Sequence, residues 1–158
     1  MRDLIQTDED RSRIIAMARA WDGTPYVADG AIKGAGCSCS SLPWAVLKEF
    51  GHTAPEIPRR MGLHKVEIHP LMLSWLNEHP EHYRKIELKW YDEADRKRVC
   101  ISCFQPGDLL IINLGIGHAL LAVDKGEAMH SWQNGGCHAG QISSLETRLT
   151  GAWRPVVP

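Results

Sequence analysis

Cys39, His118 and His130 are the residues of this sequence best suited to covalent chemistry. Cys39 lies where a glycine-rich loop gives way to a predicted helix, and the amides of a helix N-terminus favour a thiolate and can donate to an oxyanion. A cysteine nucleophile also needs a base, which must be close in space but not in sequence. His118 begins a predicted strand, and His130 lies on the next one. If the tight turn at 124–126 pairs these strands, both imidazoles can share one face, and His130 can orient His118.

The five cysteines raise a second possibility, which is a metal site. They are Cys37, Cys39, Cys100, Cys103 and Cys137. Four thiolates could bind zinc, but structural zinc sites place two to four residues between the cysteines of each pair, and the C-x-C pair does not fit that spacing. We therefore expect no metal and no cofactor. An odd number of cysteines also argues against a disulfide framework, so Cys37 is expected to be a structural neighbour of the site and the others reduced structural thiols.

The remaining histidines show no coherent spacing for metal ligands, and we expect them at the surface. They are His52, His64, His69, His79, His82 and His138.

The length and composition indicate one globular domain over residues 1–158. Hydrophobic residues make up 44% and charged residues 23% of the chain, close to globular averages. Eighteen basic and nineteen acidic residues give a net charge of −1, which offers no electrostatic basis for binding nucleic acid or an acidic membrane. No apolar run reaches the 18 residues or so that a transmembrane helix needs. The polar start of the sequence lacks the apolar core of a secretory signal, so we expect synthesis in the cytoplasm without a signal peptide.

The first half of the sequence predicts three helices separated by loops. Thr7 and Asp10 form a capping pair for the first helix, and Gly51 ends the second. A glycine-rich loop is expected at 29–36 and a surface connection at 52–68. The predicted helices are 8–21, 42–50 and 71–78.

The second half has the short apolar or alternating runs of β-strands, with turn signals between them. Helices followed by closely spaced strands predict an α+β domain in which N-terminal helices pack on an antiparallel sheet. The predicted strands are 83–90, 108–114, 118–123, 128–132 and 152–157.

A set of short motifs, in this order and spacing, resembles the NlpC/P60 family over roughly residues 10–157, most closely its phage-tail and prophage-type cell-wall peptidases. The motifs are Trp21-Asp22-Gly23-Thr24-Pro25-Tyr26, Gly36-Cys37-Ser38-Cys39-Ser40-Ser41-Leu42, Pro106-Gly107-Asp108-Leu109-Leu110, Gly117-His118-Ala119 and Met129-His130.

The resemblance implies a papain-like α+β fold and a cysteine peptidase or amidase that cleaves peptidoglycan stem peptides next to D-glutamate. It implies that Cys39 is the nucleophile, His118 the base and His130 the orienting residue. Tyr26 matches a family tyrosine whose hydroxyl faces the nucleophile and helps to hold the oxyanion. Trp132, just beyond His130, is expected to line the substrate groove. The implied partners are a peptidoglycan peptide and phage tail proteins, with packaging into a phage or phage-like particle.

Three residues depart from the family pattern around the nucleophile. Ser38 replaces an aspartate that commonly binds the free amine of the substrate, and is therefore the expected substrate contact at this position. Ser41 replaces a glycine. Pro43 lacks an amide and disfavours helical geometry at Leu42, which predicts a helix that starts late or kinks. These departures leave two alternatives open, a catalytically impaired phage tail structural protein and a thiol acyltransferase or deamidase on the same fold.

Overall fold

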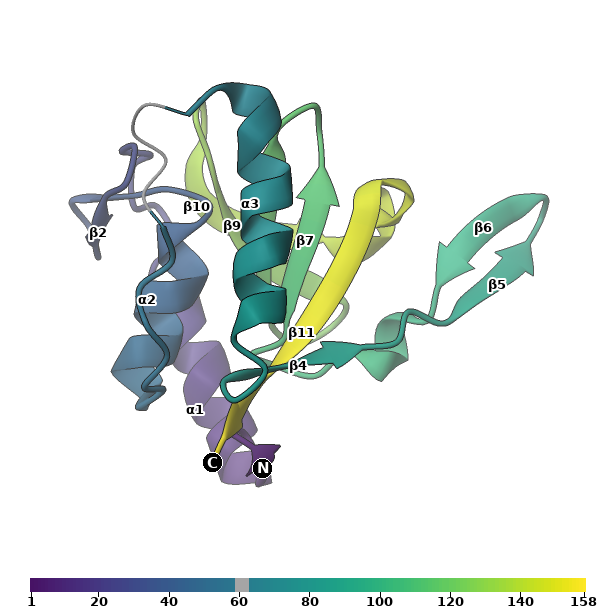
Figure 1. The fold of residues 1–158 in the computed structure, drawn as a ribbon, viewed down its shortest axis with the longest axis horizontal. Coiled ribbons are helices and arrows are strands. Elements are labelled where there is room, and N and C mark those ends of the chain that lie inside the picture. Colours follow the sequence, from purple (N-terminus) through teal and green to yellow (C-terminus); the bar gives the residue numbers. More distant parts are fainter. Residues whose placement is uncertain (59–62) are drawn as a thin grey trace.

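The described part of the chain folds into three α-helices packed on a curled antiparallel sheet, as the order of elements predicts (Figure 1). The computed structural model describes residues 1–58 and 63–158. Within these residues, no helix has both the length and the apolar character needed to cross a bilayer.

Helix α1 spans Asp8–Arg19 and begins where its capping pair predicts. The amide of Asp10 donates to the Thr7 hydroxyl at 3.0 Å, and the amide of Thr7 donates to the Asp10 carboxylate at 3.1 Å. These two bonds satisfy amides that have no partner within the helix. The helix ends two residues before the predicted Trp21, which is nevertheless buried in the core.

Helix α2 spans Ser41–Phe50 and ends at Gly51, which adopts the left-handed conformation with φ of 114°. The expectation that Pro43 delays its start is wrong. Pro43 is the third residue of the helix, and amides of the first turn have no intrahelical acceptor. The proline therefore removes no helical hydrogen bond at this position.

Helix α3 spans Lys65–Glu78 and starts six residues before the predicted helix at 71–78. The amide of His64 donates to the carboxylate of Glu67 at 2.7 Å, which caps the added first turn. Pro70 lies inside the helix on its exposed side. The predicted surface connection at 52–68 is thus helical at its C-terminal end, and its residues 59–62 lie outside the described residues.

The main sheet has the strand order β1-β11-β7-β8-β9-β10, with β4 also paired to β11, and all of these pairs are antiparallel. Five of its strands follow the predicted runs. They are β4 (Tyr83–Ile86), β7 (Leu109–Asn113), β8 (Gly117–Ala122), β9 (Glu127–Trp132) and β11 (Leu149–Val157). Within the described residues, the structure has five further strands that the sequence does not predict, and β10 is the longest of them. They are β1 (Arg2–Asp3), β2 (Ala31–Ile32), β3 (Gly36–Cys37), β6 (Arg96–Val99) and β10 (Gly136–Gln141).

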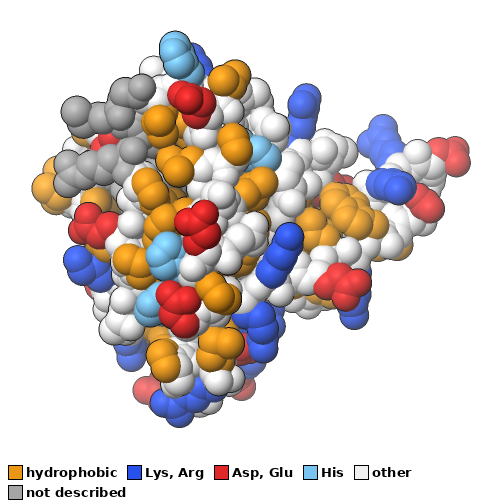
Figure 2. Space-filling view, in the orientation of Figure 1, with side chains coloured by type: hydrophobic (Ala, Val, Ile, Leu, Met, Phe, Trp, Pro, Cys, Tyr) orange, Lys and Arg blue, Asp and Glu red, His pale blue; other side chains and the backbone are white. Residues whose placement is uncertain are grey.

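The predicted strand at 83–90 ends early, because the chain leaves the sheet after β4 and enters a hairpin whose first strand begins only at Trp90. This hairpin pairs β5 (Trp90–Glu93) with β6 (Arg96–Val99) and projects from the body of the molecule (Figure 1). Trp90 and Tyr91 are 41% and 49% exposed. Basic and acidic side chains gather at its outer end (Figure 2).

The central strand β7 is buried on both faces, which explains why it reads as a continuous apolar run. Leu109 and Ile111 pack in the cluster on the helical side of the sheet. Leu110 and Ile112 pack in a second cluster with β-strand residues and two short 3₁₀ helices, η2 (Ile142–Ser144) and η3 (Glu146–Arg148). Successive side chains of a strand point to opposite faces, so this alternation follows from the backbone.

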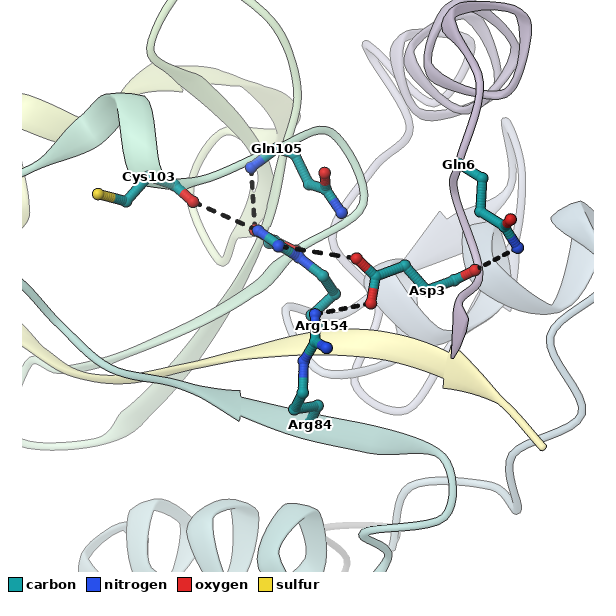
Figure 3. A network of polar contacts seen from close by, with 7 residues as sticks. Asp3, Gln6, Arg84, Cys103, Gln105 and Arg154 are labelled. Atoms are coloured by element: carbon teal, nitrogen blue, oxygen red, sulfur yellow. Dashed lines mark hydrogen bonds and ion pairs between the residues drawn. The ribbon is translucent and has the colours of Figure 1, made fainter. Parts of the chain in front are cut away.

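Arg154 on β11 lies within a network of polar contacts (Figure 3), and its buried ion pair with Asp108 joins β11 to the start of β7. The guanidinium of Arg154 donates to both carboxylate oxygens of Asp108 at 2.8 and 2.9 Å, and Asp108 has no exposed surface. Burial raises the pKa of Asp108, although the hydrogen bonds from Arg154 act in the opposite direction. Arg154 also donates to the carbonyl of Cys103 at 3.3 Å, so it ties the segment before β7 to the sheet.

Candidate active site

Cys39 lies between β3 and α2, two residues before the helix begins. Its residue surface is 3% exposed, and its Sγ atom lies 4.0 Å from the carbonyl oxygen of Gly117 on β8. The structure therefore brings the loop-to-helix cysteine beside the strand that carries His118, at Gly117, which is 78 residues further along the chain. This juxtaposition is the one that the sequence motifs predict.

Ser38 is placed differently from the expectation that it contacts substrate. Its side chain is fully buried, and it caps the first turn of α2. The Ser38 hydroxyl accepts from the amide of Ser41 at 3.3 Å, and the Ser38 carbonyl accepts from the amide of Leu42 at 3.1 Å. In return, the Ser41 hydroxyl accepts from the amide of Ser38 at 2.9 Å and donates to the carbonyl of Gly30. The two serines that depart from the family pattern thus hold the loop and the helix together.

The hairpin of β8 and β9 brings the two predicted histidines together. Lys125 and Gly126 adopt positive φ values of 57° and 71°, and the amide of Val123 donates to the carbonyl of Glu127 at 2.9 Å. The two strands pair with Leu121 opposite Met129. This register places His118 and His130 on the same face, where His118 Nε2 lies 3.1 Å from His130 Nδ1. The two histidines are therefore in contact, as the hairpin predicts.

Trp132 fixes the direction of this hydrogen bond. Its indole Nε1 lies 3.1 Å from His130 Nε2, and an indole N–H can only donate. His130 Nε2 therefore accepts, and a neutral His130 carries its proton on Nδ1. That proton is donated to His118 Nε2, so His118 Nδ1 is the ring nitrogen left to hold the proton of a neutral His118. The indole also stacks on the His118 ring, with centroids 4.2 Å apart and an angle of 18° between the planes.

His130 is kept neutral by its surroundings. Burial, and to a smaller extent the nearby His138, lower its pKa to about 4. The His138 ring lies across the β9–β10 pair with its centroid 4.6 Å from that of His130. Gly140 makes room for this arrangement, because a Cβ atom there would lie 2.8 Å from His130 Nε2.

Cys39 and His118 open onto a common cavity of about 580 Å³. Tyr26 and Trp132 also line it, as predicted. The polar residues 133–135, which form the turn between β9 and β10, line it as well. Ser38 and His130 are not among the lining residues. The part of the wall formed by described residues therefore offers imidazole, amide, hydroxyl and aromatic groups and carries no carboxylate, Lys or Arg.

The surface assignment of the remaining histidines is wrong in two cases. His138 was expected at the surface but lines the cavity, because it lies on β10, a strand that the sequence did not reveal. His52 is buried, and its ring packs edge-on against Tyr83 with its Nε2 3.2 Å from the Val156 carbonyl oxygen. Burial lowers the pKa of His52. The only sequence signal for His138 is its position in a short alternating run after Gly135-Gly136.

The cysteines occupy three separate places and do not assemble into the four-thiolate set considered above. Cys37 pairs with Cys137 in the core, where a hydrogen bond between the thiols lowers the pKa of Cys37 and raises that of Cys137. Cys100 and Cys103 face each other in the segment between β6 and β7. Across residues 1–58 and 63–158, no three His, Cys, Asp or Glu side chains are grouped so that they could hold a metal ion.

Helix α3 closes over β8 at the residue that precedes His118. A Cβ atom at Gly117 would lie 2.6 Å from the Cα of His69, so only glycine allows the helix and the strand to approach this closely. The same glycine supplies the carbonyl beside Cys39 Sγ. The packing of α3 therefore helps to position both halves of the site.

Two solved structures resemble this fold, both at low sequence identity. One, from Staphylococcus aureus subsp. aureus Mu50, is described as similar to lipoprotein, NLP/P60 family, with a TM-score of 0.60 and 20% identity. The match covers 97% of this chain and 43% of that one, so this chain spans less than half the length of the other protein. The other is the NlpC/p60 domain of the peptidoglycan hydrolase SagA, with a TM-score of 0.51 and 21% identity over 89% of this chain and 95% of that one.

No curated protein matches the sequence. The NlpC/P60 family matches residues 23–154, which include Tyr26, Cys39, His118 and His130. A match over this much of the sequence shows that the chain belongs to the NlpC/P60 family.

Proposed function

We propose that the protein is a cysteine peptidase or amidase that hydrolyses peptidoglycan stem peptides next to D-glutamate. The observation that carries the proposal is that Cys39 and His118 line the same cavity, with Cys39 Sγ 4.0 Å from the carbonyl oxygen of Gly117, the residue before His118. A thiol and a base on one cavity, with His130 hydrogen-bonded to the base, are the parts that acyl transfer requires.

In the proposed reaction, the proton of neutral His118 first shifts from Nδ1 to Nε2, which then donates to His130 Nδ1. The free Nδ1 atom of His118 takes the proton of the Cys39 thiol, and the thiolate attacks the amide carbonyl. The oxyanion is held by backbone amides beside Cys39 and by the Tyr26 hydroxyl. The amides of Ser41 and Leu42 already bond Ser38, so they are less suited to this role. His118 then gives the proton to the leaving amine as the C–N bond breaks, and Cys39 remains as a thioester.

A water molecule completes the proposed reaction. It loses a proton to His118 as its oxygen attacks the thioester carbonyl, and the acid leaves as the proton returns to the Cys39 sulfur. A protonated His118 carries a proton on Nε2 as well as on Nδ1, and that proton must be accepted by His130 Nδ1. His130 then carries its own proton on Nε2, which faces the Trp132 N–H. The hydrogen bond from Trp132 must therefore break during catalysis.

The substrate class is supported by the family and by the printed description of SagA as a peptidoglycan hydrolase. The cavity is large enough for part of a peptide, and its polar end at Gln133–Gly135 provides groups that can bond peptide amides. Ser38 is directed away from this space, so we propose that recognition relies on the amide and aromatic lining and not on position 38.

The experiment is digestion of purified muropeptides by the reduced wild-type protein, by Cys39→Ala and by Cys100→Ser. We expect release of the D-glutamate-linked fragments with the wild type and Cys100→Ser, and none with Cys39→Ala. A thiol-reactive active-site probe should label Cys39 in the same preparation. The proposal is abandoned if the wild type cleaves no muropeptide and the probe leaves Cys39 unlabelled.

The same preparation separates the two alternatives. Probe labelling of Cys39 without hydrolysis, together with a thioester or amide product from an added acyl donor, would indicate an acyltransferase or deamidase. A Cys39→Ala variant that supports full particle function would indicate a phage tail structural protein. The capped start of α2 favours the hydrolase, because the departures at Ser38, Ser41 and Pro43 leave the helix intact.

The phage-tail branch and delivery in a phage or phage-like particle are also part of this proposal. Their support is the resemblance of the sequence motifs. Mass spectrometry of purified particles from the source cells would detect the protein among the tail components, and its presence only in the cell envelope or cytosol would exclude this route.

A further inference from the structure

Cys100 and Cys103 lie outside the candidate active site, and their two thiols are in contact. They flank Ile101 and Ser102 in a C-x-x-C sequence, and residues Ile101–Cys103 form the 3₁₀ helix η1. The amide of Cys103 donates to the carbonyl of Cys100 at 3.1 Å. Side chains three residues apart eclipse one another in a 3₁₀ turn. The two Sγ atoms consequently lie 2.8 Å apart.

Both thiols can be reached from solvent, in contrast to the other cysteine pair. Cys100 and Cys103 are both partly exposed, and Ser102 between them is exposed. Cys37 and Cys137 have at most 1% of their surface exposed. A small reagent can therefore attack the C-x-x-C pair without unfolding the core.

The contacts around the pair distinguish the two sulfurs. The thiol of Cys103 donates toward Cys100 Sγ, and the Ser102 hydroxyl lies 3.3 Å from the same atom. These contacts, together with the charge of Lys89, lower the pKa of Cys100. The same hydrogen bond raises the pKa of Cys103. A thiolate is the nucleophile in disulfide exchange, so Cys100 is suited to attack and Cys103 to resolve.

We propose that Cys100 and Cys103 form a reactive dithiol site that closes to an intramolecular disulfide by exchange with a low-molecular-weight disulfide such as oxidised glutathione. The Cys100 thiolate attacks one sulfur of that disulfide, which forms a mixed disulfide and releases one glutathione thiolate. The Cys103 sulfur then attacks Cys100 Sγ, which forms the Cys100–Cys103 bond and releases the second glutathione. The protein loses two electrons and two protons, and the reagent becomes two glutathione thiols.

The disulfide would link the base of the projecting hairpin to the buried ion pair. The amide of Cys100 donates to the carbonyl of Lys89 just before β5, at 2.8 Å. The carbonyl of Cys103 accepts from Arg154, and its sulfur points away from that guanidinium (Figure 3). Oxidation therefore leaves the Arg154–Asp108 pair in place while it fixes the turn that carries the hairpin.

The test is to incubate the reduced full chain with oxidised glutathione, block remaining thiols with N-ethylmaleimide and map the products by mass spectrometry. We expect the wild type to lose two hydrogen atoms, to gain two fewer maleimides and to contain a Cys100–Cys103 linked peptide. Cys103→Ser should retain one glutathione on Cys100. Cys100→Ser should react at least about tenfold more slowly at Cys103, because the thiol of lower pKa is lost.

A Cys39→Ala background excludes the cavity thiol as the source of any adduct and makes the result independent of the proposed hydrolase. The inference is overturned if wild-type Cys100 and Cys103 do not react under these conditions. It is equally overturned if glutathione persists on either residue without ring closure, or if the new disulfide joins either residue to another cysteine. The wild-type measurements alone decide these outcomes, so they do not depend on how well a variant folds.

Discussion

Replacement of Trp132 by phenylalanine tests the proton arrangement of the site. Phenylalanine keeps a ring that can stack on His118 but has no N–H to donate to His130 Nε2. In the proposed mechanism, the wild-type pair of a Cys39 thiolate and a protonated His118 forms only when the Trp132–His130 hydrogen bond breaks. We therefore expect Trp132→Phe to increase the population of this reactive pair.

The size of the effect follows from the free energy of one hydrogen bond. A net contribution of about 0.5–1.5 kcal/mol corresponds to roughly a two- to twelvefold change in population. The acidic limb of the pH profile for Cys39 reactivity should move to lower pH by up to about 1 unit, since 1.36 kcal/mol corresponds to one pKa unit.

The assay is the rate of Cys39 alkylation by iodoacetamide between about pH 5 and 9, followed by peptide mapping so that the other cysteines do not contribute. A small reagent is preferable to substrate because Trp132 also lines the cavity, so its replacement can change the binding of a substrate. Trp90→Phe is the matched control, since Trp90 is exposed on the projecting hairpin and should leave the profile unchanged. ¹⁵N NMR of the wild type should find the His130 proton on Nδ1. Unchanged or slower alkylation in Trp132→Phe at every pH, with a protonated His130 Nε2 in the wild type, would refute the reasoning.

Three further predictions concern stability. The pKa of His130 is about 4 in the folded protein and about 6.5 in an unfolded chain. The unfolded state therefore binds more protons between these values, and the free energy of unfolding should fall by up to about 3 kcal/mol as the pH is lowered from 6.5 to 4. Urea unfolding over this pH range should show a smaller loss of unfolding free energy in His130→Gln than in the wild type. If the unfolding free energies of the two proteins change in parallel with pH, the low pKa of His130 is contradicted. Ser38→Ala should lower the free energy of unfolding by about 1 kcal/mol through loss of the cap, with KM for muropeptide unchanged. A raised KM at unchanged stability would instead restore position 38 as a substrate contact. Arg154→Met should lower the free energy of unfolding by about 3 kcal/mol because it leaves Asp108 buried without its partner, whereas the more exposed Arg84→Met should cost under about 1 kcal/mol. Equal effects of the two arginine variants in urea unfolding would argue against a special role for the buried pair.

The sequence was sufficient to predict the central geometry of the site. The Asp124–Gly126 turn sets the register of β8 and β9, and that register alone places His118 and His130 on one face. The start of α1 was equally predictable, because Thr7 and Asp10 act within one turn of the chain. Both inferences depend on local contacts, for which sequence patterns carry most of the information.

The parts that could not be predicted depend on partners distant in sequence. Strand β10 has few apolar residues and is defined by its pairing with β9, so His138 could not be assigned to the cavity. His52 is polar but is enclosed by Tyr83 and the end of β11. Ser38 could be aligned with a substrate-binding aspartate, but the direction of its side chain is set by hydrogen bonds with Ser41.

Because Gly117 has no side chain, the packing of helix α3 is coupled to the geometry of the candidate site. Helix α3 rests directly on the backbone of β8 at this point, next to the carbonyl that contacts the Cys39 sulfur. A fluctuation that lifts the helix also frees this carbonyl and the neighbouring His118. Cys39 and His118 thus share one cooperative unit with α3, and we expect thermal opening of that helix to disrupt the candidate site before the rest of the sheet unfolds.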